Sequence, residues 1–393
     1  MFIPGRIEVL GKHTDYCGGR SIVCAVDRGF HASIEPRADR YVELSNLDTG
    51  ENASLDLANP AAVASGHWTT YAGEVIRRLT SNFPERISHG CTIRFRSDLP
   101  KAAGQSSSSA LMIMVFAALD AVNDLRSCDE FRENIYDDRD LAEYLGCIEN
   151  GQSFRGLQGS AGVGTFGGSQ DHAAILLGRT NTLSRFAFAP LRREGEFTFT
   201  NDLTFVVASS GVIAEKTGAA RAKYNRVSRM ISDITSALGP GSLASVIDER
   251  GIDEVRRAVK SGTRSFSGEE LLGRLKQFYV ENYEIIPRVS ELLAAGHHEG
   301  IGELVDASQH NAERLLGNQV EETVFLQRSA REIGAIAASA FGAGFGGSVY
   351  AIVQTPEAER FRSEWQAGYV SRFSEHAITS EFFTTRPSQI VIT

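Results

Sequence analysis

The chain has 393 residues, of which 42% are hydrophobic and 23% charged, and its formal net charge is -9. A chain of this length and composition can bury two hydrophobic cores, so we expect a two-domain globular protein. Proteins that bind nucleic acid carry clustered excess lysine and arginine, so the acidic balance argues against nucleic acid as a partner.

The cysteines and the apolar runs bear on the compartment. The five cysteines are scattered and form no C-x-x-C pair, which is typical of reduced thiols in a cytoplasm. No basic and then apolar leader follows Met1, and no apolar run reaches the roughly 18 residues of a membrane span. We therefore expect a soluble, cytoplasmic protein with no membrane partner, and we leave its oligomeric state open.

The first half of the chain is predicted to be mixed α/β. Short β-branched runs with polar alternation predict strands over residues 6–13 and 20–36. Apolar residues at helical spacing predict a helix over 67–83, and alternation returns over 90–100. Residues 106–125 are apolar on nearly every face, which predicts a buried helix.

The second half is predicted to be mainly helical and to end in a second sheet. Residues 180–210 alternate strongly, and a helical stretch follows over 215–322, interrupted by a polar loop at 261–270. The segments SVYAIVQ (348–354) and ITSEFFTT (378–385) resemble strands.

The domain boundary is predicted at the Pro-Leu-Arg-Arg-Glu-Gly stretch, residues 190–195. We divide the chain into a first domain, residues 1–192, and a second domain, residues 193–393. The fold class expected from this order of elements is α+β.

The loop GKHTDYCGG, residues 11–19, groups unlike polar side chains close to the start of the chain. It places a cation, an imidazole, a carboxylate and a phenol at Lys12, His13, Asp15 and Tyr16. Asp, Cys and Gly also favour turns, so a solvated turn is the alternative.

Three segments are rich in glycine. GVGTFG (162–167) fits the dinucleotide pattern G-x-G-x-x-G, but no clear strand precedes it, so we interpret it as a chance match. LPKAAGQSSSSALMIM (99–114) ends a strand and begins a buried helix, whose N-terminus favours an anion. An ordinary helix cap, the alternative, needs one serine and not four. FGAGFGG (341–347) allows two backbones to approach closely.

In this order, the segments resemble the three motifs of the GHMP small-molecule kinases, and in particular their galactokinase branch. PGRIEVLGKHTDYCGG resembles the galactokinase signature P-G-R-x-N-x-I-G-E-H-T-D-Y-N-G-G, PKAAGQSSSSA resembles P-x-x-x-G-L-S-S-S-A, and FGAGFGG resembles the third motif. The resemblance implies an N-terminal ribosomal S5 domain 2-like α/β domain, a C-terminal α+β domain and an active site in the cleft between them. The implied activity is ATP-dependent phosphorylation of the anomeric C1 hydroxyl of galactose or a related monosaccharide.

The resemblance also implies site residues. FGGSQDH matches the region of the catalytic aspartate, which is Asp171 here, and Arg6 would steady it and the moving phosphoryl group. Ser108 and Glu149 would hold Mg²⁺, although Glu149 lies 171 - 149 = 22 residues before Asp171, which implies a loop insertion. The substrate would be bound by Lys12, His13, Asp15 and Tyr224, the last in KYNRVSR. The ATP phosphates would lie at six consecutive residues: Gly104, Gln105, Ser106, Ser107, Ser108 and Ser109.

The chain departs from the family pattern at Lys12, where the signature has Glu, at Glu8, where it has Asn, and at Gln105, where it has Leu. A glutamate accepts hydrogen bonds from sugar hydroxyls, whereas a lysine only donates. Lys12 either reaches the sugar, which we favour, or pairs with Glu8 or another carboxylate. Two alternatives remain beside galactose phosphorylation: a kinase for another sugar, such as a uronic acid, and a non-catalytic sugar sensor.

Overall fold

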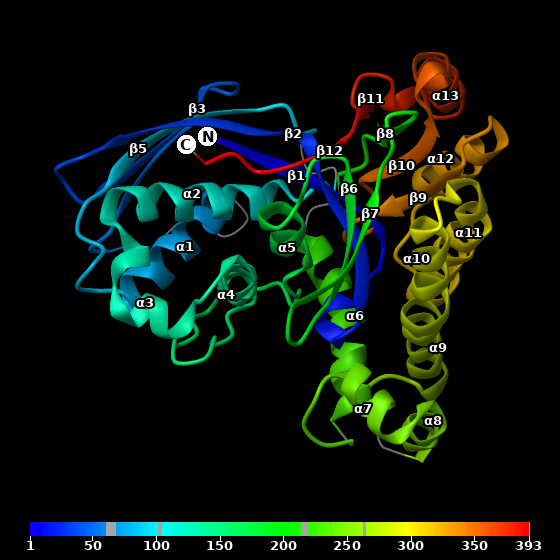
Figure 1. Ribbon diagram of the computed structural model, residues 1–393, viewed down its shortest axis with the longest axis horizontal. Helices are drawn as coiled ribbons and strands as arrows, with labels where there is room; N and C mark the ends of the chain where they lie inside the picture. Colours follow the sequence, from blue (N-terminus) through cyan, green and yellow to red (C-terminus); the bar gives the residue numbers. More distant parts are fainter. Residues whose placement is uncertain (60–67, 101–103, 214–217, 237, 262–264, 393) are drawn as a thin grey trace.

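The fold is described from a computed structural model, which places two sheets side by side (Figure 1). The residues that it describes are 1–59, 68–100, 104–213, 218–236, 238–261 and 265–392. Three predicted features lie wholly or partly outside the described residues. They are the start of the helical stretch at residue 215, part of the glycine-rich segment at 99–114 and part of the loop at 261–270.

The first sheet is built around β2 (Arg20–Pro36), which covers the second predicted strand in full. The paired strands follow the order β4-β3-β5-β2-β6-β7, and β1 and β12 also pair with β2. The other strands of this sheet are β1 (Phe2–Leu10), β3 (Tyr41–Asn46), β4 (Asn52–Asp56), β5 (Cys91–Ser97), β6 (Thr182–Ala187), β7 (Arg192–Thr198) and β12 (Pro387–Ser388).

Helices cover one face of the first sheet (Figure 1). They are α1 (Thr69–Asn82), α2 (Ser107–Asn123), α3 (Asp129–Asn134), α4 (Asp138–Asn150) and α5 (Gln170–Leu176). The helix α2 packs against β1 and β2 on one side and against α1 on the other, which explains why its sequence is apolar on nearly every face.

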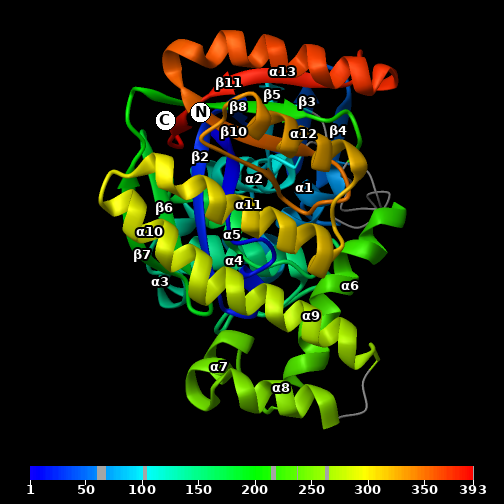
Figure 2. The ribbon, with the colours of Figure 1, turned by 90° about the vertical axis from the view of Figure 1, so that its right-hand side faces the viewer.

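The second sheet has the order β11-β8-β10-β9 (Figure 2). Its strands are β8 (Leu203–Ser209), β9 (Ala337–Phe341), β10 (Ser348–Gln354) and β11 (Glu381–Thr385). The helices α12 (Glu321–Glu332) and α13 (Ala358–Arg372) form an apolar cluster with one face. The other face shares a cluster with β1, so one core joins the two sheets.

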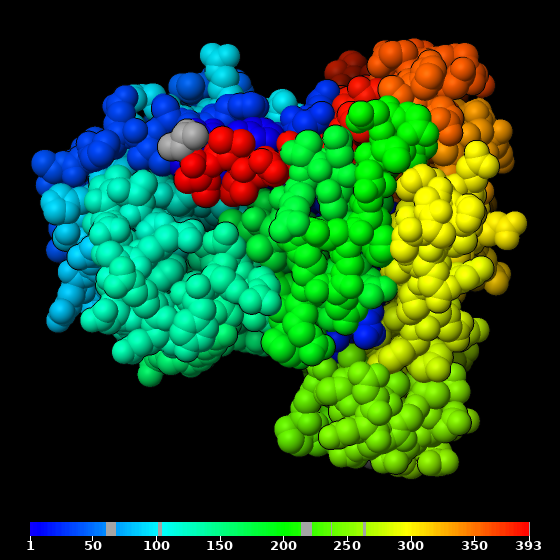
Figure 3. All heavy atoms as spheres, viewed as in Figure 1, coloured from blue at the N-terminus to red at the C-terminus, as the bar shows by residue number. Residues whose placement is uncertain are grey.

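The remaining helices form the long helical half that the sequence predicts. They are α6 (Gly218–Thr235), α7 (Leu243–Arg250), α8 (Ile252–Ser261), α9 (Gly268–Tyr279), α10 (Ile286–Ala294) and α11 (Gly302–Asn311). A π-helical turn, Val280–Ile285, joins α9 to α10 in one continuous rod. The helices α7 and α8 project from the body of the molecule (Figure 3).

The chain changes sheets between β7 and β8 and returns at its end. The pairing of β12 with β2 and the hydrogen bond from Phe2 N to Val391 O attach the last residues to the first sheet. The division at residue 192 stays a prediction. All five cysteines are free, as predicted. In the part of the chain that the structure describes, no helix combines the length and apolarity needed to cross a bilayer.

Candidate active site

A cavity lies where the two domains meet, and residues from both line it. Arg6 and Glu8 reach it from β1, Glu149 from α4, Asp171 from α5 and Tyr224 from α6. Its volume of about 40 Å³ has room for only a few water molecules. A larger cavity of about 430 Å³ adjoins it, and four residues line both: Asp15, Tyr16, Gly167 and Gly168.

Arg6 and Asp171 form a buried ion pair at this cavity. Arg6 Nε donates to Asp171 Oδ1 at 2.8 Å, and Nη2 lies 2.7 Å from the same oxygen. Arg6 is 2% exposed, so it is not a surface arginine. The N-cap of α5 is Ser169, so Asp171 does not cap this helix. The pair fixes the direction in which the Asp171 carboxylate faces the cavity.

The loop at residues 11–19, which we call the opening loop, contributes His13 and Asp15 to the cavity. His13 Nε2 lies 3.2 Å from Ala343 O. Because a carbonyl oxygen only accepts, Nε2 carries the hydrogen of the neutral ring. The other ring nitrogen, Nδ1, lies 2.9 Å from the Tyr16 hydroxyl. Asp15 Oδ2 accepts from Gln170 N at 3.3 Å, next to Asp171 in the chain. The loop is thus part of a polar cavity wall and not a solvated turn.

Tyr224 brings the second domain to the same wall. Its ring centroid lies 5.5 Å from that of His13. The neighbouring Asn225 holds the segment 162–167 by accepting from Phe166 N at 3.1 Å and donating to Gly164 O at 2.9 Å. This segment is irregular and no strand precedes it, so it is not a dinucleotide-binding turn, as the sequence indicates.

Sequence reasoning missed the helical rod that holds the opening loop. Arg274 Nη2 donates to His13 O at 2.6 Å, and Gln277 Nε2 donates to Lys12 O at 3.1 Å. In the π-helical turn, Glu281 accepts from Gly11 N at 2.8 Å and Asn282 accepts from Arg20 N at 2.8 Å. Nothing in the local pattern of residues 274–282 signals these contacts, because their partners lie more than 250 positions away.

Lys12 corrects one prediction. It does not line the cavity, and its ammonium donates to Ser339 Oγ at 2.6 Å and to Ser308 Oγ at 3.5 Å in the second domain. The reason is Gly11, whose φ of 108° turns the chain so that the Lys12 side chain enters the core between the domains. Ser308 also donates to Glu281 at 3.0 Å.

Carboxylates act on the Lys12 ammonium, although its hydrogen bonds go to the two serines. Burial lowers the pKa of its ammonium, and the carboxylates of Glu281 and Glu8 act in the opposite direction. Lys12 is therefore a buried cation that the carboxylates of Glu281, Glu8 and Glu313 act on, and it does not line this cavity.

Of the three residues that depart from the family pattern, Glu8 lines the cavity. Burial raises the pKa of its carboxyl to about 7, while Lys12 and Arg6 act to lower that pKa. Glu8 Oε2 accepts from Gln170 Nε2 at 2.6 Å, and Gln170 Oε1 in turn accepts from Ser21 Oγ at 2.7 Å. The other oxygen, Glu8 Oε1, is buried and has no hydrogen-bond partner among the described residues.

The predicted phosphate loop lies beside Arg6. Arg6 Nη1 donates to Gly104 O, and Arg6 N donates to Gln105 O at 3.3 Å. Gly104 has a φ of 75°, and a Cβ added at Gly342 would lie 2.7 Å from Gly104 O, so the third glycine-rich motif packs on this loop as closely as glycine allows.

Several polar atoms of this loop fit a polar ligand. Gln105, Ser106 and Ser109 each hold buried side-chain oxygen or nitrogen atoms that bond to nothing else in the described residues. Ser107 begins α2, and Ser108 follows it in the first turn, where the helix N-terminus favours an anion. These donors suit the phosphates of a nucleotide.

Glu149 is buried and lines the cavity together with Asp171, although the two are 22 positions apart in the chain. The intervening loop folds back on α4, since Val163 N donates to Glu149 O at 2.9 Å. A serine hydroxyl and a carboxylate are oxygen donors of the kind that Mg²⁺ prefers. Within the described ranges no group of three or more His, Cys, Asp or Glu could hold a metal ion, so a metal here would take few ligands from the protein.

Comparisons with known proteins agree with the motifs. The family described as the galactokinase galactose-binding signature matches residues 2–36, GHMP kinases N terminal domain matches 70–179, and GHMP kinases C terminal matches 289–371. The galactokinase of Exiguobacterium sibiricum is 26% identical to this chain over 95% of this chain and 90% of its own. The galactokinase of Lactobacillus helveticus is 27% identical over 92% of this chain and 87% of its own.

Solved structures show the same fold. The crystal structure of Lactococcus lactis galactokinase complexed with galactose superposes with a TM-score of 0.80 at 22% identity, over 100% of this chain and 94% of that one. The Methanococcus jannaschii mevalonate kinase superposes with a TM-score of 0.57 at 15% identity, over 99% of this chain and 98% of that one. The predicted α+β fold with two domains is confirmed.

Proposed function

Because the chain belongs to the GHMP kinase superfamily and to its galactokinase-like branch, we propose that it transfers the terminal phosphoryl group of ATP to the C1 hydroxyl of galactose or a related neutral monosaccharide. The chain is thus a sugar kinase, and the proposal adds its substrate and its cofactors. The observation that carries the proposal is Arg6, which binds both Asp171 at the cavity and Gly104 in the phosphate loop. One buried side chain thus connects the proposed sugar site with the proposed nucleotide site.

In this reaction the Asp171 carboxylate orients the C1 hydroxyl and accepts its proton as the oxygen bonds to phosphorus. The Arg6 guanidinium holds Asp171 and stabilises the negative charge that builds up on the transferred group. His13, Asp15 and Tyr224 bind the sugar hydroxyls. The ring would extend into the adjoining cavity, because the first cavity is too small to hold it alone.

The nucleotide binds at residues 104–109, with Ser108 and Glu149 as the protein ligands of Mg²⁺. When bound, Mg²⁺ neutralises part of the phosphate charge. We expect Ser108→Ala to raise severalfold the Mg²⁺ concentration that gives a half-maximal rate, because one oxygen ligand is lost. Steady-state rates over a magnesium titration measure this, with Ser81→Ala, an exposed serine on α1, as the control. An unchanged magnesium dependence would place the metal elsewhere.

The site chemistry disfavours the uronic-acid alternative. Four carboxyl groups line the cavity, those of Glu8, Asp15, Glu149 and Asp171, and Lys12 lies outside it. A substrate carboxylate in this cavity would face four carboxyl groups and one arginine, Arg6, which already binds Asp171. Like charges cost several kcal/mol when juxtaposed. We therefore expect kcat/KM for galactose to exceed that for galacturonate by at least about tenfold, which corresponds to about 1.4 kcal/mol.

A sugar panel with the full chain, ATP and Mg²⁺ tests the proposal, with the product identified by phosphorus NMR. Galactose 1-phosphate formed in step with ADP supports it. Tight galactose and ATP binding without any product would instead indicate the non-catalytic sensor, and a clear preference for galacturonate would restore the uronic-acid kinase.

A further inference from the structure

Only one of the two oxygens of the Glu8 carboxyl has a hydrogen-bond partner among the described residues. Its Oε2 is bound by Gln170, whereas its Oε1 has no hydrogen-bond partner among the described residues, although the side chain is 3% exposed. A buried oxygen without a partner costs free energy, so such an atom at a cavity wall points to a ligand that supplies the missing donor.

The neighbouring donors are directed elsewhere. The Arg6 guanidinium faces Asp171 and Gly104, and the Lys12 ammonium faces Ser339 and Ser308. The Gln170 amide is oriented by Ser21, so its single contact with Glu8 is the one to Oε2. Since none of these described donors faces Oε1, we take its donor to be a group bound in the cavity that Glu8 lines.

We propose that Glu8 reads the sugar, with Oε1 accepting a hydrogen bond from the hydroxyl on C2. This rests on the proposed kinase function, which places the C1 hydroxyl at Asp171. Glu8 and Asp171 line the same cavity of about 40 Å³, so Glu8 lies close to the reacting position. Of the two ring atoms bonded to C1 in a pyranose, the ring oxygen only accepts, and C2 carries the hydroxyl that donates.

The contact sets the substrate class. A hydroxyl that donates to Oε1 satisfies a buried oxygen that otherwise stays unpaired, so the chain would select sugars with a donor at C2 and reject those without one. The galactokinase signature has Asn at this position, so a carboxyl group there is a feature of this chain.

The test is the ratio of kcat/KM for galactose to that for 2-deoxygalactose, measured for the wild type, Glu8→Gln and Glu8→Ala. We expect a ratio of about tenfold or more in the wild type, and a ratio within about twofold in Glu8→Ala. The ratio of galactose to 6-deoxygalactose should be the same in all three proteins. Glu74→Ala is the matched control, since Glu74 is also buried with one unpartnered oxygen but lies outside the cavity.

A wild-type ratio within about twofold, or an equal ratio in the wild type and a folded Glu8→Ala variant, overturns the proposal. Glu8→Gln keeps the size of the side chain but also keeps an oxygen that accepts, so Glu8→Leu, which has neither acceptor nor donor, replaces Glu8→Ala if the latter does not fold. If the wild type phosphorylates no sugar, the proposed function fails. The same ratios taken from calorimetric dissociation constants then test Glu8 separately.

Discussion

Asp171→Asn is expected to lower kcat on galactose by about 10²- to 10⁴-fold, the usual effect of losing a general base. Asparagine keeps the shape of the side chain, and its carbonyl oxygen can still accept from Arg6 Nε, but it does not take up the proton of the C1 hydroxyl. Release of ADP in the presence of galactose measures the rate, and calorimetry with ATP checks that the nucleotide still binds.

The loss of an ion pair alone must be separated from the loss of the base. Asp140 provides the match, because it pairs with Arg155 at 2.6 Å and is 12% exposed, against 13% for Asp171, yet lies outside both cavities. Asp140→Asn should lower the melting temperature and leave kcat unchanged. A folded Asp171→Asn enzyme with a rate near that of the wild type would remove Asp171 from the mechanism.

The elements that the sequence predicts well are those whose pattern is local. The predicted strand at 348–354 is β10 residue for residue, and α2 lies within the predicted buried helix. The strand β9 was not predicted, because its sequence AASAF offers small side chains and no alternation, and its place is set by pairing with β10. The π-helical turn at Val280–Ile285 is likewise fixed by its distant contacts with the opening loop.

The same distinction applies to the site. Motifs spaced over the whole chain predict that Arg6 and Asp171 belong together, and the structure brings them into contact. Lys12 lies between Gly11 and His13, which both have positive φ angles, and no pattern of side chains predicts that Lys12 turns away from the cavity. The contribution of Arg274 could not be predicted either, since a buried arginine in a helix gives no sign of the backbone carbonyl that it binds.

Lys12→Glu is expected to destabilise the folded protein by about 3 to 5 kcal/mol, the range for breaking a buried charge pair. The new carboxylate would lie near Glu281 and Glu8 and would have no cation in place of the lost ammonium. Against a typical net stability of about 5–15 kcal/mol, this is a large fraction. Urea denaturation of the full chain, followed by tryptophan fluorescence and circular dichroism, measures the change.

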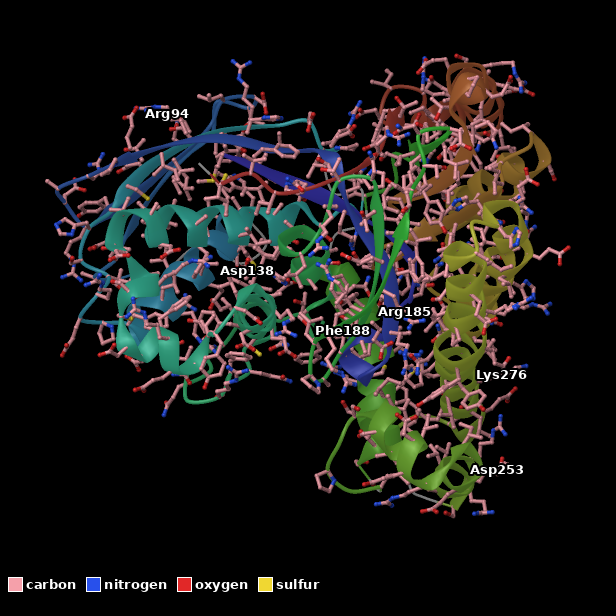
Figure 4. The ribbon with its side chains drawn as sticks, in the orientation of Figure 1. Arg94, Asp138, Arg185, Phe188, Asp253 and Lys276 are labelled. Atoms are coloured by element: carbon pink, nitrogen blue, oxygen red, sulfur yellow. The ribbon has the colours of Figure 1, made fainter. Side chains whose placement is uncertain are left out.

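The control for charge reversal is Lys276→Glu, because Lys276 lies on α9 with its side chain exposed (Figure 4), and a surface substitution of this kind changes stability by no more than about 0.5 kcal/mol. Lys12→Met, which keeps most of the length of the side chain without its charge, should fall between the two, since it leaves Glu281 and Glu8 without the ammonium but adds no third carboxyl. The buried position also makes a prediction about specificity. In any folded Lys12 variant, the ratio of kcat/KM for galactose to that for galacturonate should stay within about twofold of the wild-type ratio, because the side chain does not face the cavity. Lys12→Glu could instead unfold at the same midpoint urea concentration as the wild type and shift that ratio tenfold or more. In that case the ammonium reaches the substrate, and the placement of Lys12 between the domains is wrong.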